Sequence, residues 1–377
     1  MKKILFKSKA ISLQNILAAF FILVYIFCIS CERQSEGSRK EGEHIHNTVK
    51  ASVETDPVPQ AKNADAADDP AIWINHKNPA KSVVYGTDKR GGIASYDLNG
   101  KQLNYYPYGK MNNCDIRYNF PLNNEKIDIL ACSNRSSHSI SLFKISEGGV
   151  LDSIHSGIIT CRMKGEVYGL CMYNSPVSEK YYVFINSKAG EVEQWELFEN
   201  EGKVDANLVR SFNLDSQTEG MVADDKYSTV YIGKEIDGIW KFDAEPNGNN
   251  IGKYINNSSA ENKNIRYDIE GLAVYKTEQG NGYLIASSQG NYSYAVFERQ
   301  GNNKYLGSFR IVDGEIDGVE ETDGIEITNF SLGKNFPAGM LVVQDGYNYD
   351  EGKKRAQNFK YISWEHIETL LITFSSQ

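Results

Sequence analysis

The segment Val230-Tyr-Ile-Gly-Lys-Glu-Ile-Asp-Gly-Ile-Trp-Lys-Phe242 contains two short apolar runs separated by a polar loop. Both runs are rich in β-branched and aromatic residues, which is typical of β-strands. A few residues upstream, Glu219-Gly-Met221 opens another apolar run. The stretch 219–242 therefore predicts three consecutive strands, with Glu219 at the start of the first strand and Glu235 in the loop after the second.

This three-strand pattern recurs along the chain. The aromatic strands end at Tyr96, Phe143, Trp195, Phe242 and Phe297, so they are 47, 52, 47 and 55 residues apart. Six such units of about 50 residues predict an all-β fold, a six-bladed β-propeller. A two-domain sandwich would not keep one period throughout. The last unit is irregular, as expected where the two chain ends complete a ring.

Each unit places polar residues at two equivalent positions. The residues at the start of the first strand are Asp69, Asp115, Tyr168, Glu219, Glu270 and Asp323. Those in the loop after the second strand are Lys89, Arg135, Lys188, Glu235, Gln289 and Asp345. In an antiparallel sheet the start of one strand lies beside the end of the next. We therefore expect all twelve side chains at one mouth of the propeller channel.

Seven of these twelve side chains are carboxylates, and gathering them is costly unless cations neutralise them. Ca²⁺ accepts six to eight oxygen ligands in flexible geometry, so several Ca²⁺ ions are expected. Mg²⁺ demands stricter octahedra, and the absence of His and Cys at these positions disfavours Zn²⁺. Neighbouring Lys and Arg side chains suit phosphate oxygens. Metal ions and bases around phosphate indicate hydrolysis by a metal-activated water.

These residues also have structural interpretations that involve no catalysis. Asp-Gly and Glu-Gly are common turn sequences, so any single one of these acids could be structural. Cys114, Cys132, Cys161 and Cys171 suit a core or disulfides better than nucleophilic catalysis. The chain has no C-x₅-R, R-H-G-x-R-x-P, G-x-S-x-G or H-E-x-x-H motif. The net charge of −9 disfavours nucleic acid as a partner.

The N-terminus resembles an export signal. A basic start is followed by an apolar run from Ile16 to Ile29 that is short for a membrane span. Ser30-Cys31 then resembles the lipobox of bacterial lipoproteins. We expect a signal peptide over 1–30, a lipid on Cys31, a flexible tether over 31–60 and a propeller over 61–377. The protein is expected to be an exported monomer, held at a membrane by the lipid alone and facing the periplasm or cell exterior. An ordinary signal peptide and an uncleaved anchor are the alternatives.

Over about 53–364 the chain resembles the alkaline, calcium-dependent β-propeller phytases of the 3-phytase type. The resemblance is carried by ordered strings spread over all six units. They are Ala67-Asp-Asp-Pro-Ala-Ile-Trp73, Asn112-Asn-Cys-Asp-Ile-Arg-Tyr118, Ser133-Asn-Arg-Ser136, Glu166-Val-Tyr-Gly169, Ser216-Gln-Thr-Glu-Gly-Met221, Asp268-Ile-Glu-Gly-Leu272, Ser287-Ser-Gln-Gly-Asn291, Thr322-Asp-Gly-Ile325 and Gln344-Asp-Gly346. The family is a six-bladed propeller that removes phosphates from myo-inositol hexakisphosphate with several Ca²⁺ ions.

The resemblance also implies roles for individual residues. Calcium-ligand positions match Asp69, Glu219, Glu235, Glu270, Gln289 and Asp323. Phosphate-contacting positions match Lys89, Arg135, Tyr168 and Lys188. It implies that phytate, free or as its calcium complex, is attacked in line by a Ca²⁺-bridging water without a covalent enzyme intermediate, in which Glu235 takes part. A second phosphate would rest in an adjoining subsite.

The chain departs from the family pattern at three positions. Ala189 and Lys234 stand where acids are common, and Cys114 stands where an aliphatic residue is usual. The first two make the mouth less negative. Two other functions stay open: a Ca²⁺-stabilised propeller that binds a ligand or surface partner without catalysis, and a Ca²⁺-dependent lactonase. A lactonase needs a His base beside the metal, and only His138 lies in a blade loop.

Overall fold

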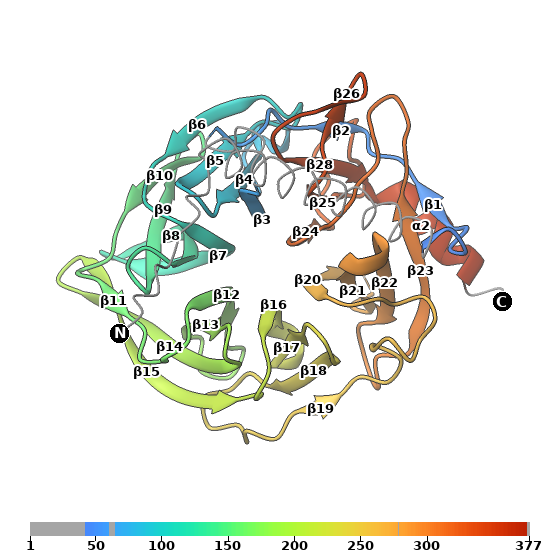
Figure 1. Cartoon of the computed structure of the whole chain (residues 1–377). Coiled ribbons are helices and arrows are strands. Elements are labelled where there is room, and N and C mark those ends of the chain that lie inside the picture. The colour runs from blue at the N-terminus through green and yellow to red at the C-terminus, as the bar shows by residue number, and fades with distance from the viewer. Residues whose placement is uncertain (1–41, 60–64, 278, 375–377) are drawn as a thin grey trace, which may run out of the picture. The chain divides into compact units, whose positions relative to one another are not determined.

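Six sheets follow one another along the chain and are arranged in a ring, as Figure 1 shows. The predicted six-bladed β-propeller is therefore confirmed. The computed structural model describes residues 42–59, 65–277 and 279–374. The predicted signal peptide over 1–30 and the predicted lipid on Cys31 lie outside the described residues.

The first three blades are built from consecutive antiparallel strands. Blade 1 consists of β3 (Ala67–Trp73), β4 (Val83–Asp88), β5 (Gly92–Tyr96) and β6 (Gln102–Tyr106). Blade 2 consists of β7 (Met111–Leu122), β8 (Glu125–Asn134), β9 (Ser139–Ser146) and β10 (Val150–Ser153), with β11 (Ile159–Thr160) also paired to β9. Blade 3 consists of β12 (Val167–Asn174), β13 (Tyr181–Ser187), β14 (Glu191–Asn200) and β15 (Lys203–Asn213).

Blades 4 to 6 repeat this order, and the innermost strand comes first in sequence in every blade, apart from the outer strands that the N-terminal segment adds to blades 5 and 6. Blade 4 consists of β16 (Thr218–Asp224), β17 (Thr229–Lys234), β18 (Gly238–Asp243) and β19 (Lys253–Tyr254). Blade 5 consists of β20 (Ile269–Lys276), β21 (Gly282–Ser288), β22 (Ser293–Glu298) and β23 (Tyr305–Ile311). Blade 6 contains β24 (Ile325–Thr328), β25 (Met340–Asp345) and β28 (Asn358–Ser363). Short elements between strands are the 3₁₀ turns η1 (Pro79–Lys81), η2 (Asp225–Tyr227) and η3 (Gln289–Asn291), and the hairpin of β26 (Tyr349–Asp350) and β27 (Lys353–Lys354).

The N-terminal part of the propeller unit completes the last two blades. β1 (Thr48–Val49) runs parallel to β23 at the outer edge of blade 5. β2 (Val53–Glu54) is antiparallel to β28 and is the outer strand of blade 6. The sequence predicts a tether over 31–60, but the compact propeller unit begins at Ile45. The correction has a physical reason, because two-residue strands are too short to produce a periodic pattern.

Each interface between neighbouring blades encloses its own apolar core. Six clusters of buried side chains lie between successive blades, such as the one that joins blades 3 and 4 through Tyr173, Phe184 and Val230. The remaining five clusters join the other pairs, including blades 6 and 1. Complete burial of one such side chain stabilises the fold by roughly 1.5–3 kcal/mol. The inner strands are thereby held in fixed positions around the axis.

A helix, α2 (Trp364–Phe374), follows the last strand of blade 6. Its first residue, Trp364, stacks on Tyr275 with ring centroids 3.6 Å apart. Ile367, Leu371 and Phe374 are also buried, so the helix covers apolar surface of blades 5 and 6. Among the described residues, no helix combines the length and apolar character needed to cross a membrane.

Candidate active site at the channel mouth

A β-bulge lies near the start of each of the first five inner strands. The pairing with the second strand of the blade shifts at Asp68-Asp69, Asn112-Asn113, Tyr168-Gly169, Glu219-Gly220 and Glu270-Gly271. In blade 6, Asp323-Gly324 occupies the same place just before β24. A bulge leaves its extra residue outside the ladder and turns the side chain. The first residue of each pair therefore projects at the mouth instead of into the sheet.

The glycines in these pairs are required by close packing around the ring. A Cβ on Gly169 would lie 1.8 Å from the carbonyl oxygen of Glu219, and one on Gly220 would lie 2.0 Å from that of Glu270. The Gly271 N–H donates to the carbonyl of Asp323 at 2.6 Å. Each Glu-Gly or Asp-Gly pair thus touches the bulge of the next blade. The glycines are sites of close backbone approach and not the turn residues of the alternative reading.

The loop residues reach the same mouth through a repeated backbone hydrogen bond. The N–H groups of Lys89, Arg135, Lys188, Glu235 and Gln289 donate to carbonyls just before the inner strand of their own blade, at 2.8–3.2 Å. In blade 6 the residue that makes this bond is Gly346, which donates to Glu320 at 2.8 Å. Five of the six predicted loop residues are therefore where the sequence places them, and the sixth position has no side chain.

Asp345 is the predicted mouth residue that this register displaces. It lies one residue before Gly346, and because side chains alternate between the faces of a sheet, it points into the blade. It is completely buried. Its Oδ2 atom lies 2.9 Å from Nζ of Lys360, which also donates to Asp317 Oδ1 and, at 2.7 Å, to the carbonyl of Gly318. Asp345 therefore belongs to a buried ion pair in blade 6.

Asp115 is also displaced from the mouth. It lies three residues beyond Asn112, the residue that occupies the bulge position in blade 2. Its carboxylate accepts two hydrogen bonds from Arg117 at 2.9 Å and one from the backbone N–H of Met172 at 2.8 Å. The side chain lines a cavity of about 460 Å³ within the channel. Because its oxygens are engaged there, Asp115 does not join the acid cluster.

Asp69 occupies the second position of its bulge, and Asp68 takes the mouth position that the sequence assigns to Asp69. One oxygen of Asp69 accepts from the Cys114 N–H at 3.0 Å, and the side chain lines the same channel cavity as Asp115. Asp68 is 1% exposed and accepts a hydrogen bond from Asn112 Nδ2 at 3.3 Å. The two consecutive acids at 68–69 show that the sequence is compatible with either residue at the mouth position.

Glu219, Glu235 and Glu270 form the densest acid cluster at the mouth. One oxygen of each lies within 4.8 Å of the others, and all three side chains are buried. Among the described residues, Glu235 Oε1 and Glu270 Oε2 have no hydrogen-bond donor. Burial, with repulsion from Glu219, raises the pKa of Glu235 to about 7. Burial and the charges of Glu219 and Glu235 raise the pKa of Glu270 well above its usual value.

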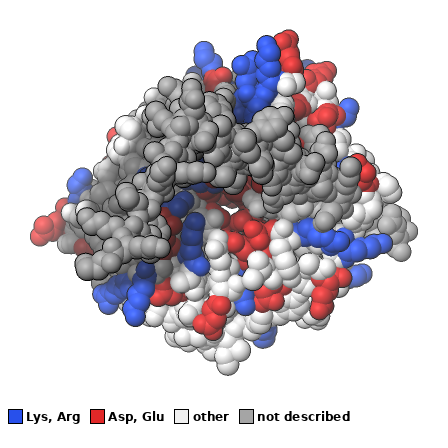
Figure 2. All heavy atoms as spheres, in the orientation of Figure 1, with Lys and Arg blue, Asp and Glu red and all other residues white. Residues whose placement is uncertain are grey.

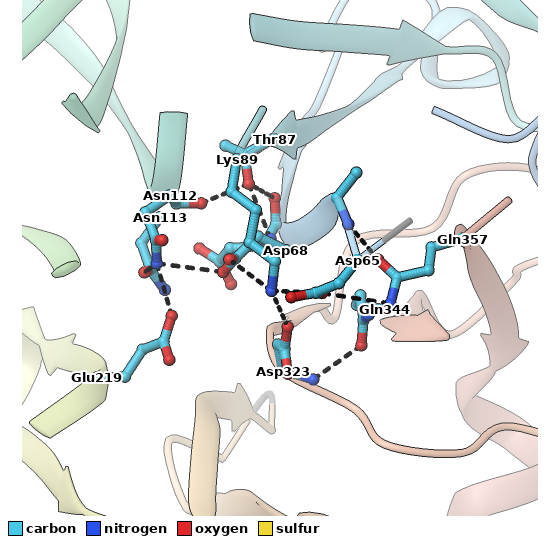
Figure 3. Close-up of polar contacts among 12 residues, drawn as sticks. Asp65, Asp68, Thr87, Lys89, Asn112, Asn113, Glu219, Asp323, Gln344 and Gln357 are labelled. Carbon is cyan, nitrogen blue, oxygen red and sulfur yellow. Dashed lines mark hydrogen bonds and ion pairs between the residues drawn. The ribbon is translucent and has the colours of Figure 1, made fainter. Parts of the chain in front are cut away.

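A second group of acids surrounds Lys89. Its Nζ atom lies 2.7 Å from Asp323 Oδ2, 2.8 Å from Asp65 Oδ1 and 3.4 Å from Asp68 Oδ2. Figure 3 shows these side chains converging from blades 1 and 6. Gln289 Nε2 donates to the other oxygen of Asp323 at 2.7 Å. Burial raises the pKa of Asp323 to about 6 although Lys89 opposes the shift.

The remaining bases gather around Tyr168. Lys188 Nζ lies 4.5 Å from the centre of the Tyr168 ring and Arg135 Cζ lies 5.8 Å from it, both within cation–π range. Arg135 also pairs with Glu166 at 2.8 Å and donates to Asn112 Oδ1 at 3.1 Å. Figure 2 shows acidic side chains at the centre of this face with basic side chains beside them. Arg135, Lys188 and Tyr168 therefore form a group of their own at the mouth, whereas Lys89 lies among acids.

Four residues of the site are not predicted by the periodic pattern of acids and bases in the sequence. Asn112 is neutral, and it links Arg135, Asp68 and Glu219 by hydrogen bonds, the last at 2.6 Å. Glu166, Asp65 and Asp268 lie just before inner strands, where the repeat has no charged position. Lys234, which departs from the family pattern, pairs with Asp237 at 2.9 Å.

The raised pKa of Glu235 predicts a specific pH dependence of stability for the metal-free protein. Between its ordinary value of 4.5 and about 7, the folded state keeps a proton that the unfolded state has released. The free energy of unfolding should therefore fall as pH rises through this window. Urea unfolding in EGTA checks this, and Glu235→Gln should reduce the fall. An equal pH slope in wild type and variant would contradict it.

Comparison with known proteins agrees with this geometry. The family model described as Phytase matches residues 15–373. The 3-phytase of Bacillus subtilis (strain 168) is 47% identical over 346 residues, which cover 90% of this chain and 89% of the relative. A crystal structure of BBS1N in complex with ARL6DN, soaked with mercury, covers 74% of each chain at 10% identity with a TM-score of 0.43, a likeness too distant to carry weight. Because the family model spans nearly the whole chain and the relative is this similar, the chain belongs to the phytase family.

Proposed function

We propose that this chain hydrolyses phosphate monoesters of phytate at the channel mouth, with calcium ions held by the mouth carboxylates. The observation that carries the proposal is the cluster of Glu219, Glu235 and Glu270, in which two buried oxygens have no donor among the described residues. Buried, unpaired carboxylates are costly, and a cation relieves the cost. The donor set fits calcium because it consists of oxygen atoms.

Two groups of residues would hold the ions. Glu219, Glu235 and Glu270 form one, and Asp68, Asp323 and Gln289 form the other. Calcium bound there would supply a Lewis acid for the phosphoryl group and a water of lowered pKa. Lys89 is held by three carboxylates, and calcium on Asp68 and Asp323 would leave Asp65 as its one acidic partner, so that its ammonium group could also donate to a phosphate oxygen.

The bases of the mouth would bind and orient the substrate. Arg135 offers a planar fork that matches phosphate oxygens, and Lys188 offers a compact charge beside the same Tyr168 ring. Tyr168 fixes the two cations relative to each other by its ring face. Orientation of the phosphoryl group toward the acid cluster lowers the barrier without a covalent intermediate.

Phosphate release from phytate, measured with calcium, with EGTA and after calcium readdition, tests this function. We expect release with calcium, loss in EGTA and recovery on readdition. Isotope-labelled water should place its oxygen in the first phosphate released, and acid quench should trap no phosphoenzyme. Calcium-dependent phytate binding without phosphate release would favour the non-catalytic alternative and contradict the proposal.

We also propose that a lipid on Cys31 anchors the exported protein, while catalysis needs no membrane. The support is the apolar run before Ser30-Cys31. Cys31→Ser should release the protein from membranes, as fractionation and lipid labelling would show. A truncated chain should start before Ile45, because the Arg310 N–H donates to the carbonyl of Asn47 at 3.0 Å and β1 follows. A membrane-bound protein without lipid label would contradict the lipid anchor. A truncated chain that folds but is inactive would contradict catalysis without a membrane.

A further inference from the structure

Cys114 and Cys132 are directly opposite each other on two antiparallel strands of blade 2. The register of β7 and β8 pairs Cys114 with Cys132. Both side chains are buried in the core between blades 1 and 2, at 4% and 0% exposure. The thiol of Cys114 donates to the carbonyl of Asp69 at 3.6 Å. Because the two residues are directly opposite, their side chains lie on the same face of the sheet.

The backbone hydrogen bonds identify which kind of cross-strand pair this is. The Cys114 N–H donates to Asp69 Oδ2 at 3.0 Å, away from β8. Two residues further on, the Ile116 N–H donates to Asp115 Oδ1 at 2.6 Å and is also turned from β8. Cys114 and Cys132 therefore form a non-hydrogen-bonded pair, for which Cα atoms are about 4.5 Å apart. That separation falls within the range of about 4.4–6.8 Å found in disulfides.

We propose that Cys114 and Cys132 form a cross-strand disulfide in the mature protein. The two thiols lose two protons and two electrons, and an S–S bond forms between the Sγ atoms. A small or protein disulfide, such as oxidised glutathione, is the oxidant, and its own S–S bond breaks to give two thiols. Because both thiols are buried in the finished blade, the bond forms before blade 2 closes against blade 1.

This bond would fasten the strands that carry part of the active site. Asn112 precedes Cys114 by two residues, and Arg135 follows Cys132 by three. Ser133 Oγ accepts from the Asn113 N–H at 3.0 Å and donates to the carbonyl of Tyr168 at 2.5 Å. The disulfide therefore lies directly behind the bulge that supports Arg135 and Tyr168. Cys161 and Cys171 belong to two other cores and serve as controls.

The test is peptide mapping of the full chain after refolding with reduced and oxidised glutathione. Free thiols are alkylated under denaturing conditions, and trypsin is used without reductant. Cleavage after Lys110, Arg117, Lys126 and Arg135 gives the fragments 111–117 and 127–135, each with one cysteine. We expect a linked pair that is two hydrogens lighter than the separate peptides. Two singly alkylated peptides, or a link to Cys161 or Cys171, would overturn the proposal.

Thermal unfolding supplies a second readout. Reductant should lower the melting temperature of refolded wild type by about 3–6 °C, given the short loop that the bond closes. Cys132→Ser should melt at the same temperature with and without reductant, whereas Cys161→Ser should respond as wild type does. If reductant lowers the melting temperature of Cys132→Ser by as much as that of wild type, the result would contradict the proposed disulfide.

Discussion

Replacement of Glu270 by Gln is expected to lower phytate turnover by roughly a hundred- to a thousandfold. The metal-supplied part of phosphoryl transfer amounts to several kcal/mol, and each 1.36 kcal/mol is tenfold in rate. One carboxylate oxygen of Glu270 lies within 4.8 Å of an oxygen of Glu219 and of Glu235 in the acid cluster. Its Oε2 atom has no other partner among the described residues. Phosphate release at saturating calcium and phytate measures the loss.

The same change should raise the stability of the metal-free protein. Glu270→Gln removes a buried charge that no donor compensates, so the melting temperature in EGTA should rise while the gain on calcium addition shrinks. Glu193→Gln is the matched control, because Glu193 is as buried but accepts from Arg162 N–H at 2.9 Å and Trp195 Nε1 at 3.0 Å. It should keep the calcium response. A full calcium response in Glu270→Gln would contradict the metal assignment.

Arg135→Ala is expected to lower kcat/KM for phytate by about ten- to a hundredfold. One charge-assisted hydrogen bond to a phosphate oxygen contributes roughly 1.5–3 kcal/mol, which corresponds to about ten- to a hundredfold in rate. Arg135→Lys keeps the charge but loses the planar fork, so its kcat/KM should lie between those of wild type and Arg135→Ala. Steady-state phosphate release measures both variants.

The structure supplies the control for this second prediction. Arg355 pairs with Asp350 at 2.6 Å in the exposed β26–β27 hairpin, and Arg355→Ala should leave kcat/KM unchanged. Loss of Arg135 should also leave the melting temperature nearly unaltered, because its partner Glu166 is 47% exposed and regains water. Undiminished turnover in a folded Arg135→Ala protein would remove this residue from the site.

The repeat in the sequence predicts the blades well because each blade must bury the same two faces. Aromatic and β-branched residues therefore recur with the period of the fold. The loop bases and Glu235 were also predictable, since a fixed backbone hydrogen bond places each one directly after the second strand. Such positions follow from strand length alone.

The inner-strand positions were less predictable because of the bulges. A bulge shifts the register by one residue, which decides between Asp68 and Asp69 at the mouth. In blade 2 the mouth position is occupied by the neutral Asn112. Sequence analysis that looks for an acid at this position therefore selects Asp115 instead. In blade 6 it is held by Asp323, but the loop position is Gly346 and the acid beside it faces inward. Local alternation cannot reveal such shifts without the paired strand.

The ammonium group of Lys360 is a positive charge buried in blade 6. Unlike a bound metal ion, it cannot dissociate from the chain. It is completely buried and is surrounded by oxygens of Asp317, Gly318 and Asp345. It lies on β28, the strand that the N-terminal strand β2 pairs with to close the ring. Under the proposed function, chelation would remove ions from the mouth but would leave this buried ion pair in place. If calcium is held at the mouth as proposed, we expect blade 6 to remain closed in the calcium-depleted protein, so that activity returns when calcium is added back.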